Sequence, residues 1–497
     1  MQRRSVTAIV APLLCGWPLA LAGEVPLSAA VAPDGAYITW REHLIDDPAI
    51  GGVPDLSGSD GLAMADLDGD GVEDIVSVHE ADIVYDQNAA GLVRIAWGSG
   101  DPGRWELSTL ASGAEVAGAE DVSIADADGD GDPDIVVAAE KAHLIYFSNP
   151  GKDVRQRRWP RVIPPVASGR GSFIRVFFAD FDGDGHPEIV AANKGEQMAG
   201  VDGKPVDTPR SVSVFLLPAE PLNGGLWREQ VLARGLVPIN SEPVDLDGDG
   251  DLDVVAGFRA EQRIAWLENL GKLRFREHAI AVRGDDPGIQ GFNMDYADID
   301  GDGRLDIVEA TPRPGPLVWL RQPEGPEQHW SLFEIGTLVP DLVTSVHLAD
   351  VDGDGDLDAF AGSYSLGPRD EDGADVGIDD QLGRIAWFEN PGTDVDRPWT
   401  RHDIVRRKRG MYDAWIARDL DRDGDLDMIG TRGNSYPYDG VIWLEQVRSA
   451  SAAPVFTAAR GEDSAVVPLP TGNVTAPATL RPEDHLPIGR EDSDAPQ

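Results

Sequence analysis

The chain has 497 residues, of which 41% are hydrophobic, and it carries a formal net charge of −45. The hydrophobic share is enough for a large core, but the length exceeds that of an ordinary single domain and favours an architecture of repeated units. The acidic excess excludes nucleic acid and anionic membrane surfaces as expected partners, because both would repel it.

The first predicted element is an export signal at residues 1–22. Arg3 and Arg4 precede an apolar run at residues 8–21, and Ala20-Leu21-Ala22 forms a small-x-small cleavage site. The alternative, an N-terminal membrane anchor, would be expected to have a longer apolar run. The only cysteine, Cys15, lies inside the signal. We therefore expect a secreted protein (periplasmic, cell-surface or extracellular) whose mature chain has no disulfide and no membrane span.

A motif of the form Asp-x-Asp-x-Asp-Gly-x-x-(Asp/Glu) follows, and it occurs seven times at intervals of 52 to 69 residues. Ca²⁺ takes about six to eight oxygen ligands, and carboxylates at positions 1, 3, 5 and 9 with a backbone carbonyl at position 7 can surround one ion. Glycine at position 6 allows the sharp turn that this requires. Position 7 varies from Val72 to His186 and Arg304, as expected for a residue that contributes only its carbonyl. The sequence therefore predicts about seven calcium sites, one in each repeat.

The predicted ligands are the residues at positions 1, 3, 5, 7 and 9 of each repeat. In chain order they are Asp66, Asp68, Asp70, Val72 and Asp74; Asp126, Asp128, Asp130, Asp132 and Asp134; Asp180, Asp182, Asp184, His186 and Glu188; Asp245, Asp247, Asp249, Asp251 and Asp253; Asp298, Asp300, Asp302, Arg304 and Asp306; Asp350, Asp352, Asp354, Asp356 and Asp358; and Asp419, Asp421, Asp423, Asp425 and Asp427. The third repeat, with Glu188 at position 9, and the seventh, with Arg422 at position 4, are expected to be the weakest sites.

Two other interpretations of the motif fit less well. An EF-hand needs a glutamate at position 12 and a helix on each side, but only Glu309 meets the first condition, and the flanking residues are β-branched, as in Val254-Val255. Asp-Gly turns without a metal remain an alternative for any single repeat. Across seven repeats with three or four acids each, repulsion would splay the loops unless a cation held them together.

The same four strands are predicted around each loop. An apolar strand enters the loop, as at residues 122–125, and a second leaves it, as at 134–137. A third strand carries an aromatic residue, as in Ile95-Ala96-Trp97, and a fourth begins with a bulky aromatic residue, as at 105–110. Four antiparallel strands make one blade of a β-propeller.

The seventh repeat has no fourth strand after its loop, but residues 40–45 have the fourth-strand pattern and precede the first loop. We expect this N-terminal strand to pair with the last blade and close the ring, which removes exposed sheet edges. The expected fold class is all-β, a seven-bladed β-propeller over residues 37–447 with one calcium loop in each blade. Residues 448–497, rich in Ala, Ser, Pro and acids, are expected to be a disordered tail.

These repeats resemble those of the FG-GAP/VCBS calcium-loop propellers, the repeat class of integrin alpha-subunit heads and of many bacterial exported proteins. The resemblance covers about residues 37–447 and is specific for the fold and the metal. It implies no single activity, because the class includes adhesins, scaffolds and enzymes. The literal Phe-Gly and Gly-Ala-Pro elements of the integrin repeat are absent, so integrin-like protein binding does not follow.

The face opposite the calcium loops is the predicted ligand site, because second strands end there and first strands begin there with polar residues. The candidate ligand-binding residues are Glu80, Glu120, Glu140, Arg175, Lys194, Glu242, Arg259, Tyr364 and Arg432. They would suit a carbohydrate or protein ligand with polar groups. A solvated rim whose charges pair with one another is the alternative.

Some families with similar propellers are enzymes, among them rhamnogalacturonan and ulvan lyases and a sugar dehydratase. By that resemblance, His79, His347 or Tyr412 could act as acid or base. Arg175, Lys194 or Arg259 could neutralise a uronate carboxylate before β-elimination. No segment matches a catalytic motif of those enzymes closely, so the sequence leaves open a ligand-binding module and, as the alternative, a polysaccharide lyase or sugar dehydratase.

Overall fold

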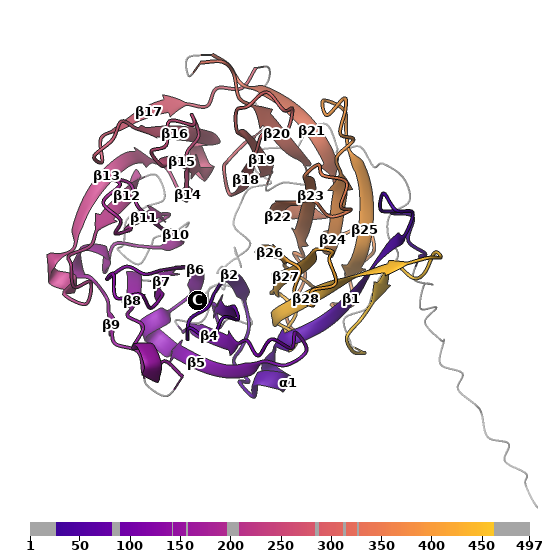
Figure 1. Cartoon of the computed structure of the whole chain (residues 1–497), viewed down its shortest axis with the longest axis horizontal. Coiled ribbons are helices and arrows are strands. Elements are labelled where there is room, and N and C mark those ends of the chain that lie inside the picture. Colours follow the sequence, from indigo (N-terminus) through magenta and orange to yellow (C-terminus); the bar gives the residue numbers. More distant parts are fainter. Residues whose placement is uncertain are drawn as a thin grey trace, which may run out of the picture.

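The computed structural model describes residues 26–81, 90–141, 143–155, 158–195, 208–283, 288–311, 315–325 and 328–461. In these residues, seven sheets stand around a ring (Figure 1), six with four antiparallel strands and one with five strands. The expected all-β fold, a seven-bladed propeller, is confirmed.

Within each blade of the first six, the strands follow the chain from the middle of the ring to its rim. The sheets are β2 (Ser59–Ala65), β3 (Asp74–His79), β4 (Leu92–Trp97), β5 (Glu106–Ser112); β6 (Ala119–Ala125), β7 (Asp134–Ala139), β8 (His143–Phe147), β9 (Arg161–Val162); β10 (Phe173–Ala179), β11 (Glu188–Asn193), β12 (Arg210–Leu216), β13 (Arg228–Gly235); β14 (Pro238–Val244), β15 (Asp253–Phe258), β16 (Arg263–Asn269), β17 (Phe275–Ala279); β18 (Asn293–Ala297), β19 (Asp306–Ala310), β20 (Pro316–Arg321), β21 (Ser331–Thr337); β22 (Leu342–Ala349), β23 (Asp358–Tyr364), β24 (Gly383–Glu389), β25 (Thr400–Arg407); and β26 (Trp415–Arg418), β27 (Asp427–Arg432), β28 (Gly440–Ser449), β1 (Tyr37–Asp46), β29 (Phe456–Thr457).

Helical structure is limited to short turns between strands in the described residues. These are α1 (Pro48–Gly51), η1 (Gly113–Val116), η2 (Gly151–Asp153), η3 (Pro165–Ala167), η4 (Gly224–Leu226) and η5 (Arg259–Glu261). None of them approaches the length needed to cross a bilayer.

The core lies between blades, because each sheet buries both faces against its neighbours. The second strands are buried along all or nearly all of their length, as β15 and β23 show, which explains their apolar runs. Position 2 of each loop is an apolar residue, and the structure shows that of the first loop pointing between blades. This residue, Leu67, packs with Val76 of its own blade and Ile135 of the next.

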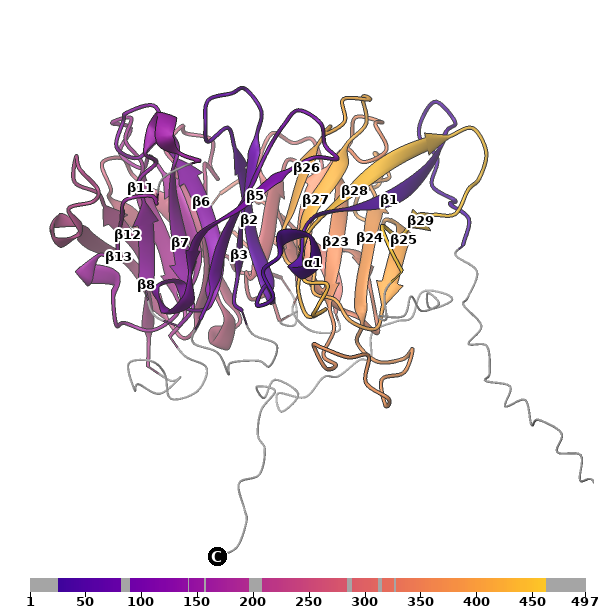
Figure 2. The same cartoon turned by 90° about the horizontal axis from the view of Figure 1, so that it is seen from below.

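The seventh sheet contains segments from both ends of the described chain (Figure 2). β1 runs antiparallel to β28, with Trp40 opposite Gln446, and β29 pairs in parallel with β1 on the other side. The expected tail boundary at residue 448 differs from this arrangement, because β28 continues to Ser449 and Phe456 of β29 is buried in the core. Residues 462–497 of the predicted tail and residues 1–22 of the predicted signal lie outside the described residues.

Candidate functional site: acidic loops and a polar hollow

Each acidic loop is folded by hydrogen bonds from its own backbone to its own carboxylates. In the first loop, the Asp70 N–H donates to Asp68 Oδ1 over 3.1 Å, and the Val72 N–H donates to Asp70 Oδ1 over 2.9 Å. The same two bonds occur in all seven loops. Asp side chains bond readily to backbone two residues ahead, so nine local residues suffice to fix the loop.

The turns of the loop need left-handed backbone at positions 4 and 6. In the first loop, Gly69 has a φ of 74° and Gly71 a φ of 86°, and the Gly71 N–H donates to Asp66 Oδ2 over 2.9 Å. Position 4 is glycine in six loops, but in the seventh it is Arg422, whose φ is 64°. An L-residue with a Cβ is strained in this region.

We expect Arg422→Gly to stabilise the protein by about 1 kcal/mol, because glycine adopts the left-handed conformation without the Cβ clash. Arg422 is exposed, so the substitution removes little packing. Equilibrium unfolding in urea measures the difference. Arg422→Ala is the control, since it keeps the Cβ and should show no gain; equal stabilities of the two variants would contradict the prediction.

The carboxylate oxygens of a loop converge. One oxygen from each of Asp66, Asp68 and Asp70 lies within 4.8 Å of the other two. The fourth loop has the same trio at positions 1, 3 and 5, and the second and third loops have a trio at positions 1, 3 and 9. The crowding has an electrostatic cost: partial burial, together with the charge of Asp354, raises the pKa of Asp352 to about 6. The donors are all hard oxygens, which fit Ca²⁺ and leave negative charge for it to neutralise.

The acid at position 9, predicted as a metal ligand, also joins the loop to the third strand. Asp253 accepts the N–H of Leu246 at 3.2 Å, the N–H of Asn269 at 2.7 Å and the indole N–H of Trp266 at 2.8 Å. Its burial raises its pKa to about 7. In the second and third loops, the position-9 acids Asp134 and Glu188 also have an oxygen within 4.8 Å of the acids at positions 1 and 3.

A group of amides that the sequence reading missed ties each of four loops to the next blade. The Asn269 side chain, fully buried at the end of β16, donates to the carbonyl of Phe181 in the third loop over 2.8 Å and to that of Leu252 over 3.0 Å. Asn149, Gln322 and Gln446 make the equivalent bond to the position-2 carbonyl of the loop before theirs. The signal was present, because an Asn or Gln stands three residues after the aromatic residue of the third strand.

We expect Asn269→Ala to destabilise the protein by about 2 kcal/mol, because it leaves two buried carbonyls without their donor. Asn223→Ala is the matched control, since the exposed Asn223 amide bonds to Glu220 at the surface. Urea unfolding of both variants measures the effect. Equal losses in the two variants would show that the interblade bond adds no stability.

Five predicted ligand-binding residues come together at the inner ends of the first two strands of neighbouring blades. Lys194 forms an ion pair with Glu140, and both are buried. Arg175 Nη2 lies 2.9 Å from Asp413 Oδ2 and 2.5 Å from the Asn293 side-chain oxygen. Close by, burial and then the charge of Glu80 raise the pKa of Glu120 to about 8, although Lys194 and Arg175 act against them.

Of the other predicted ligand-binding residues, Arg259 and Glu242 lie near Arg175 of this group. Arg259 places its guanidinium 4.9 Å from the ring centre of Phe292, which Arg175 also approaches. Burial and the charge of Asp295 raise the pKa of Glu242 to about 8. Tyr364 ends β23, opposite Leu342. Arg432 is buried in the seventh blade, where its Nε donates to Ser435 Oγ over 3.1 Å.

Two of the three predicted acid–base residues are core residues. His79 is fully buried between the hydroxyls of Ser59 and Ser77, and burial, with the charge of Arg94, lowers its pKa to about 3. Tyr412 is also fully buried and stacks near Trp415. Both side chains lie in the core and are closed to solvent in the described structure. Their role as acid or base stays a prediction.

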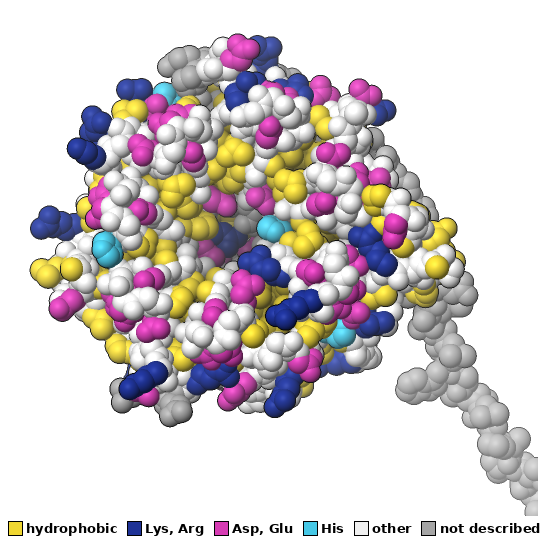
Figure 3. Space-filling model, in the orientation of Figure 1, with side chains coloured by type: hydrophobic (Ala, Val, Ile, Leu, Met, Phe, Trp, Pro, Cys, Tyr) yellow, Lys and Arg dark blue, Asp and Glu magenta, His cyan; other side chains and the backbone are white. Residues whose placement is uncertain are grey.

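His347 differs from these two, because its side chain is 32% exposed and its Nδ1 lies 3.2 Å from Asp295 Oδ2. Asp295 and His347 come from β18 and β22, the first strands of adjacent blades. Viewed down the ring, the molecule is hollowed at its middle, and acidic, basic and histidine side chains gather there (Figure 3). This hollow is where a polar ligand could meet several blades at once.

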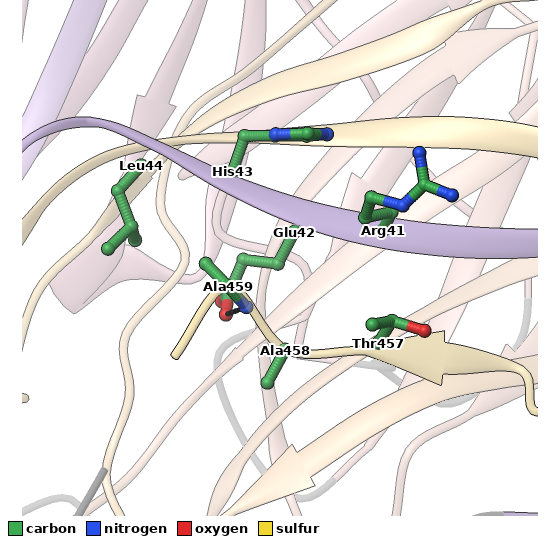
Figure 4. A pocket seen from close by; sticks show the side chains of 7 residues that line it. All are labelled: Arg41, Glu42, His43, Leu44, Thr457, Ala458 and Ala459. Atoms are coloured by element: carbon green, nitrogen blue, oxygen red, sulfur yellow. Dashed lines mark hydrogen bonds between the residues drawn. The ribbon is translucent and has the colours of Figure 1, made fainter. Parts of the chain in front are cut away.

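A separate hollow lies on the outer edge of β1 (Figure 4). It measures about 390 Å³ and is lined by residues 41–44 and 457–459. Its acid, Glu42, accepts the Ala459 N–H over 3.2 Å and is paired with Arg407. That acid is therefore occupied by the protein's own groups.

Comparison with known proteins identifies the family to which the repeats are similar. The FG-GAP-like repeat family matches residues 66–137 and 245–309, which contain the first, second, fourth and fifth loops. No curated protein matches the chain. Among solved structures, a lectin of Agrocybe aegerita described as recognising non-reducing terminal N-acetylglucosamine aligns with a TM-score of 0.46 and 16% identity, over 83% of this chain and 98% of that one. BBS1N in complex with ARL6DN aligns with a TM-score of 0.45 and 11% identity, over 82% of this chain and 97% of that one.

The matched segments cover four of the seven loops, and the other three blades have the same loop and the same order of strands. The chain is therefore an FG-GAP repeat β-propeller.

Proposed function

We propose that this protein is a calcium-binding module that recognises a ligand outside the cytoplasm. The observation that supports calcium binding is that one loop occurs seven times, with its acids held by the same backbone hydrogen bonds in every blade. In the first four loops, sets of three carboxylate oxygens lie within 4.8 Å of one another, close enough to contact one ion. Such oxygens are the donors that Ca²⁺ prefers.

Metal analysis of the purified protein tests this part. After equilibration with calcium and removal of the excess, we expect about seven equivalents of calcium for each chain. The paired substitution of Asp126 and Asp128 to Asn should remove about one equivalent, because it neutralises two ligands of a single loop. A calcium content near zero in the wild-type protein would overturn the proposal.

The ligand site that we propose is the polar hollow of the ring. His347 and Asp295 offer a donor and acceptors that are partly exposed, and the Arg175 network beside them fixes the surrounding side chains. Hydroxyl groups of a carbohydrate, or polar side chains of a protein, are ligands that such groups bind.

Binding to a glycan array and a protein array tests this site. We expect His347→Ala to lose the binding that the wild-type protein shows. His329→Ala should retain it, because His329 is an exposed residue away from the hollow. Equal binding by both variants would place the ligand elsewhere.

An enzyme is the second candidate, favoured by the contact between His347 Nδ1 and Asp295. A carboxylate at Nδ1 orients the imidazole and leaves Nε2 to take or give a proton, as β-elimination from a uronate requires. Incubation with polyuronides, followed by the absorbance of an unsaturated product, tests it. Absence of product over a broad panel, with binding on the arrays, would leave the binding module.

We also propose that residues 1–22 are removed during export and that β1 closes the ring. The first point predicts a mature chain beginning at Gly23, which mass analysis of the exported protein checks. The second is supported by the pairing of β1 with β28 over residues 37–46.

A further inference from the structure

The seven loops differ in what lies against their acids. In the first loop, Arg155 Nε is 2.5 Å from Asp68 Oδ2, and its Nη2 is 3.6 Å from Asp70 Oδ2. In the fifth loop, Arg321 Nε is 2.5 Å from Asp300 Oδ2. Asp68 and Asp300 both occupy position 3. Across the described residues, the acids at positions 1, 3 and 5 of the other five loops have no Lys or Arg within ion-pair distance.

Each of these two arginines is anchored outside its loop. Arg155 follows η2 of the second blade, and its guanidinium lies 5.0 Å from the ring centre of Trp97 in the first blade. It therefore crosses from one blade to the loop of another. Its Nη1 is also 3.4 Å from Glu106.

Arg321, at the end of β20, is anchored by aromatic residues of its own blade and by an acid of the next blade. Its guanidinium lies 4.9 Å from Trp319 and 4.6 Å from Phe333, and its Nη2 is 2.5 Å from Asp396. Aromatic faces and a second acid thus hold a positive charge at the mouth of the loop. Arg155 and Arg321 are 30% and 28% exposed, so each has room to swing into solvent.

A calcium ion and a guanidinium compete for the same oxygens. Position 3 is among the expected ligands of the loop, and a carboxylate oxygen that a guanidinium holds must give up that bond or share its charge when an ion enters. The arginine also places a positive charge against the acids of the loop, and two cations a few ångströms apart repel each other.

We propose that Arg155 and Arg321 are tethered competitors of calcium, so that the first and fifth loops fill last, and not the third and seventh as expected from the sequence alone. This inference rests on the proposed calcium binding. It divides the ring into five loops that take calcium readily and two that take it only when an arginine is displaced. Filling the first loop also releases the contact that Arg155 makes between the first and second blades.

Calorimetric titration of the metal-free full chain with calcium tests the inference. For the wild-type protein we expect about two equivalents to bind more weakly than the rest. In Arg155→Gln, one of the weakly bound equivalents should bind about tenfold more tightly. This gain is about what one partly exposed ion pair and one cation–π contact contribute together. Arg321→Gln should do the same for the other, and the double variant should bind all equivalents tightly.

Arg158→Gln is the matched control. Arg158 lies in the same connection as Arg155, but it contacts Glu115 over 3.4 Å and no loop acid. It should leave the titration unchanged. Arg155→Lys keeps the positive charge but lacks the planar guanidinium that can bind two oxygens at once. The calcium affinity of its first loop should therefore lie between those of the wild-type protein and Arg155→Gln.

The outcomes separate the two proposals. Absence of calcium binding in the wild-type protein would overturn the proposed function itself. Calcium binding with identical titrations for the wild-type protein and both Gln variants would overturn only the competition, as would weaker binding in either Gln variant. If one Gln variant does not fold, the other still decides the question, because the two loops lie in different blades.

Discussion

Chelation of divalent ions lowers the melting temperature of this protein by about 15 °C or more. The physical reason is linkage: an ion that binds the folded loop and not the open chain stabilises the folded state at every occupied site. Without ions, the converging acids of each loop repel one another, and no disulfide can hold the loops, since the only cysteine is Cys15. The shift is therefore expected to be the sum of several modest contributions.

Thermal unfolding followed by circular dichroism, in excess EDTA and in excess calcium, measures the shift. The protein with Asn at positions 126 and 128 should show a smaller difference between the two conditions, because one loop no longer responds. Equal melting temperatures in EDTA and calcium would contradict calcium binding by the loops. A shift of the same size with magnesium would point to general charge neutralisation instead.

Glu42→Gln destabilises the folded protein by about 3 kcal/mol at neutral pH. Glu42 and Arg407 form a two-pronged ion pair, with distances of 2.8 and 2.9 Å, and both side chains are almost completely buried. Glu42 belongs to β1 and Arg407 to β25 of the sixth blade, so the pair links the N-terminal strand to the neighbouring blade. Removing the carboxylate deprives a buried guanidinium of its counter-charge.

Urea unfolding compares Glu42→Gln with Glu445→Gln, a matched control in the same sheet. Glu445 pairs with Arg41, whose side chain is 49% exposed, so its loss should cost less than about 1 kcal/mol. Similar losses in the two variants would show that the buried pair has no special part in holding β1.

The penalty of Glu42→Gln also depends on pH. Burial raises the pKa of Glu42, but the charge and hydrogen bonds of Arg407 outweigh it and hold the pKa at about 2, below the ordinary value of 4.5. A carboxyl with a lowered pKa in the folded state contributes its stability above the ordinary value and loses it as the pH falls to the folded value. The difference between the wild-type protein and Glu42→Gln should therefore shrink between about pH 4.5 and pH 2.

The fold could be predicted from the sequence because its units are local. Each acidic loop is closed by bonds between residues two to five positions apart, so Asp66 to Asp74 contain the information for their own turn. The third-strand aromatics and the buried second strands then repeat at the spacing of one blade. Seven copies of the motif support the same prediction, so one irregular copy, such as that with Arg422, does not change it.

The residues that line the hollow could not be predicted as well as the fold. His79 ends β3, where the pairing with β2 is irregular, and its side chain lies in the core. Tyr412 precedes β26, and its side chain is also in the core. Strand alternation gives the direction of a side chain only where the pairing is regular. His347 lies five residues into β22, beyond the irregular pairing between Val343 and Ser345, and it keeps its expected exposure.

The side-chain contacts between blades also could not be predicted from the sequence. Asn269 and Arg155 each reach a loop of another blade, at sequence separations of 88 and 87 residues. The spacing of the motifs does not indicate whether a side chain at the end of a third strand can reach the loop of the neighbouring blade. The distance between them depends on the angle between sheets, which the ring as a whole determines.

The seventh sheet places Trp40 beside Gln446. A chain that is still being synthesised can complete six blades in turn, but the last one must wait until nearly all of the polypeptide has emerged. Until then β1 lacks its partner β28, and the nascent ring has an open seam between its first and last blades. Biogenesis should therefore be most vulnerable to proteases and to association with other chains at its final step, and a truncation near residue 440 should be degraded even though most of its blades are intact.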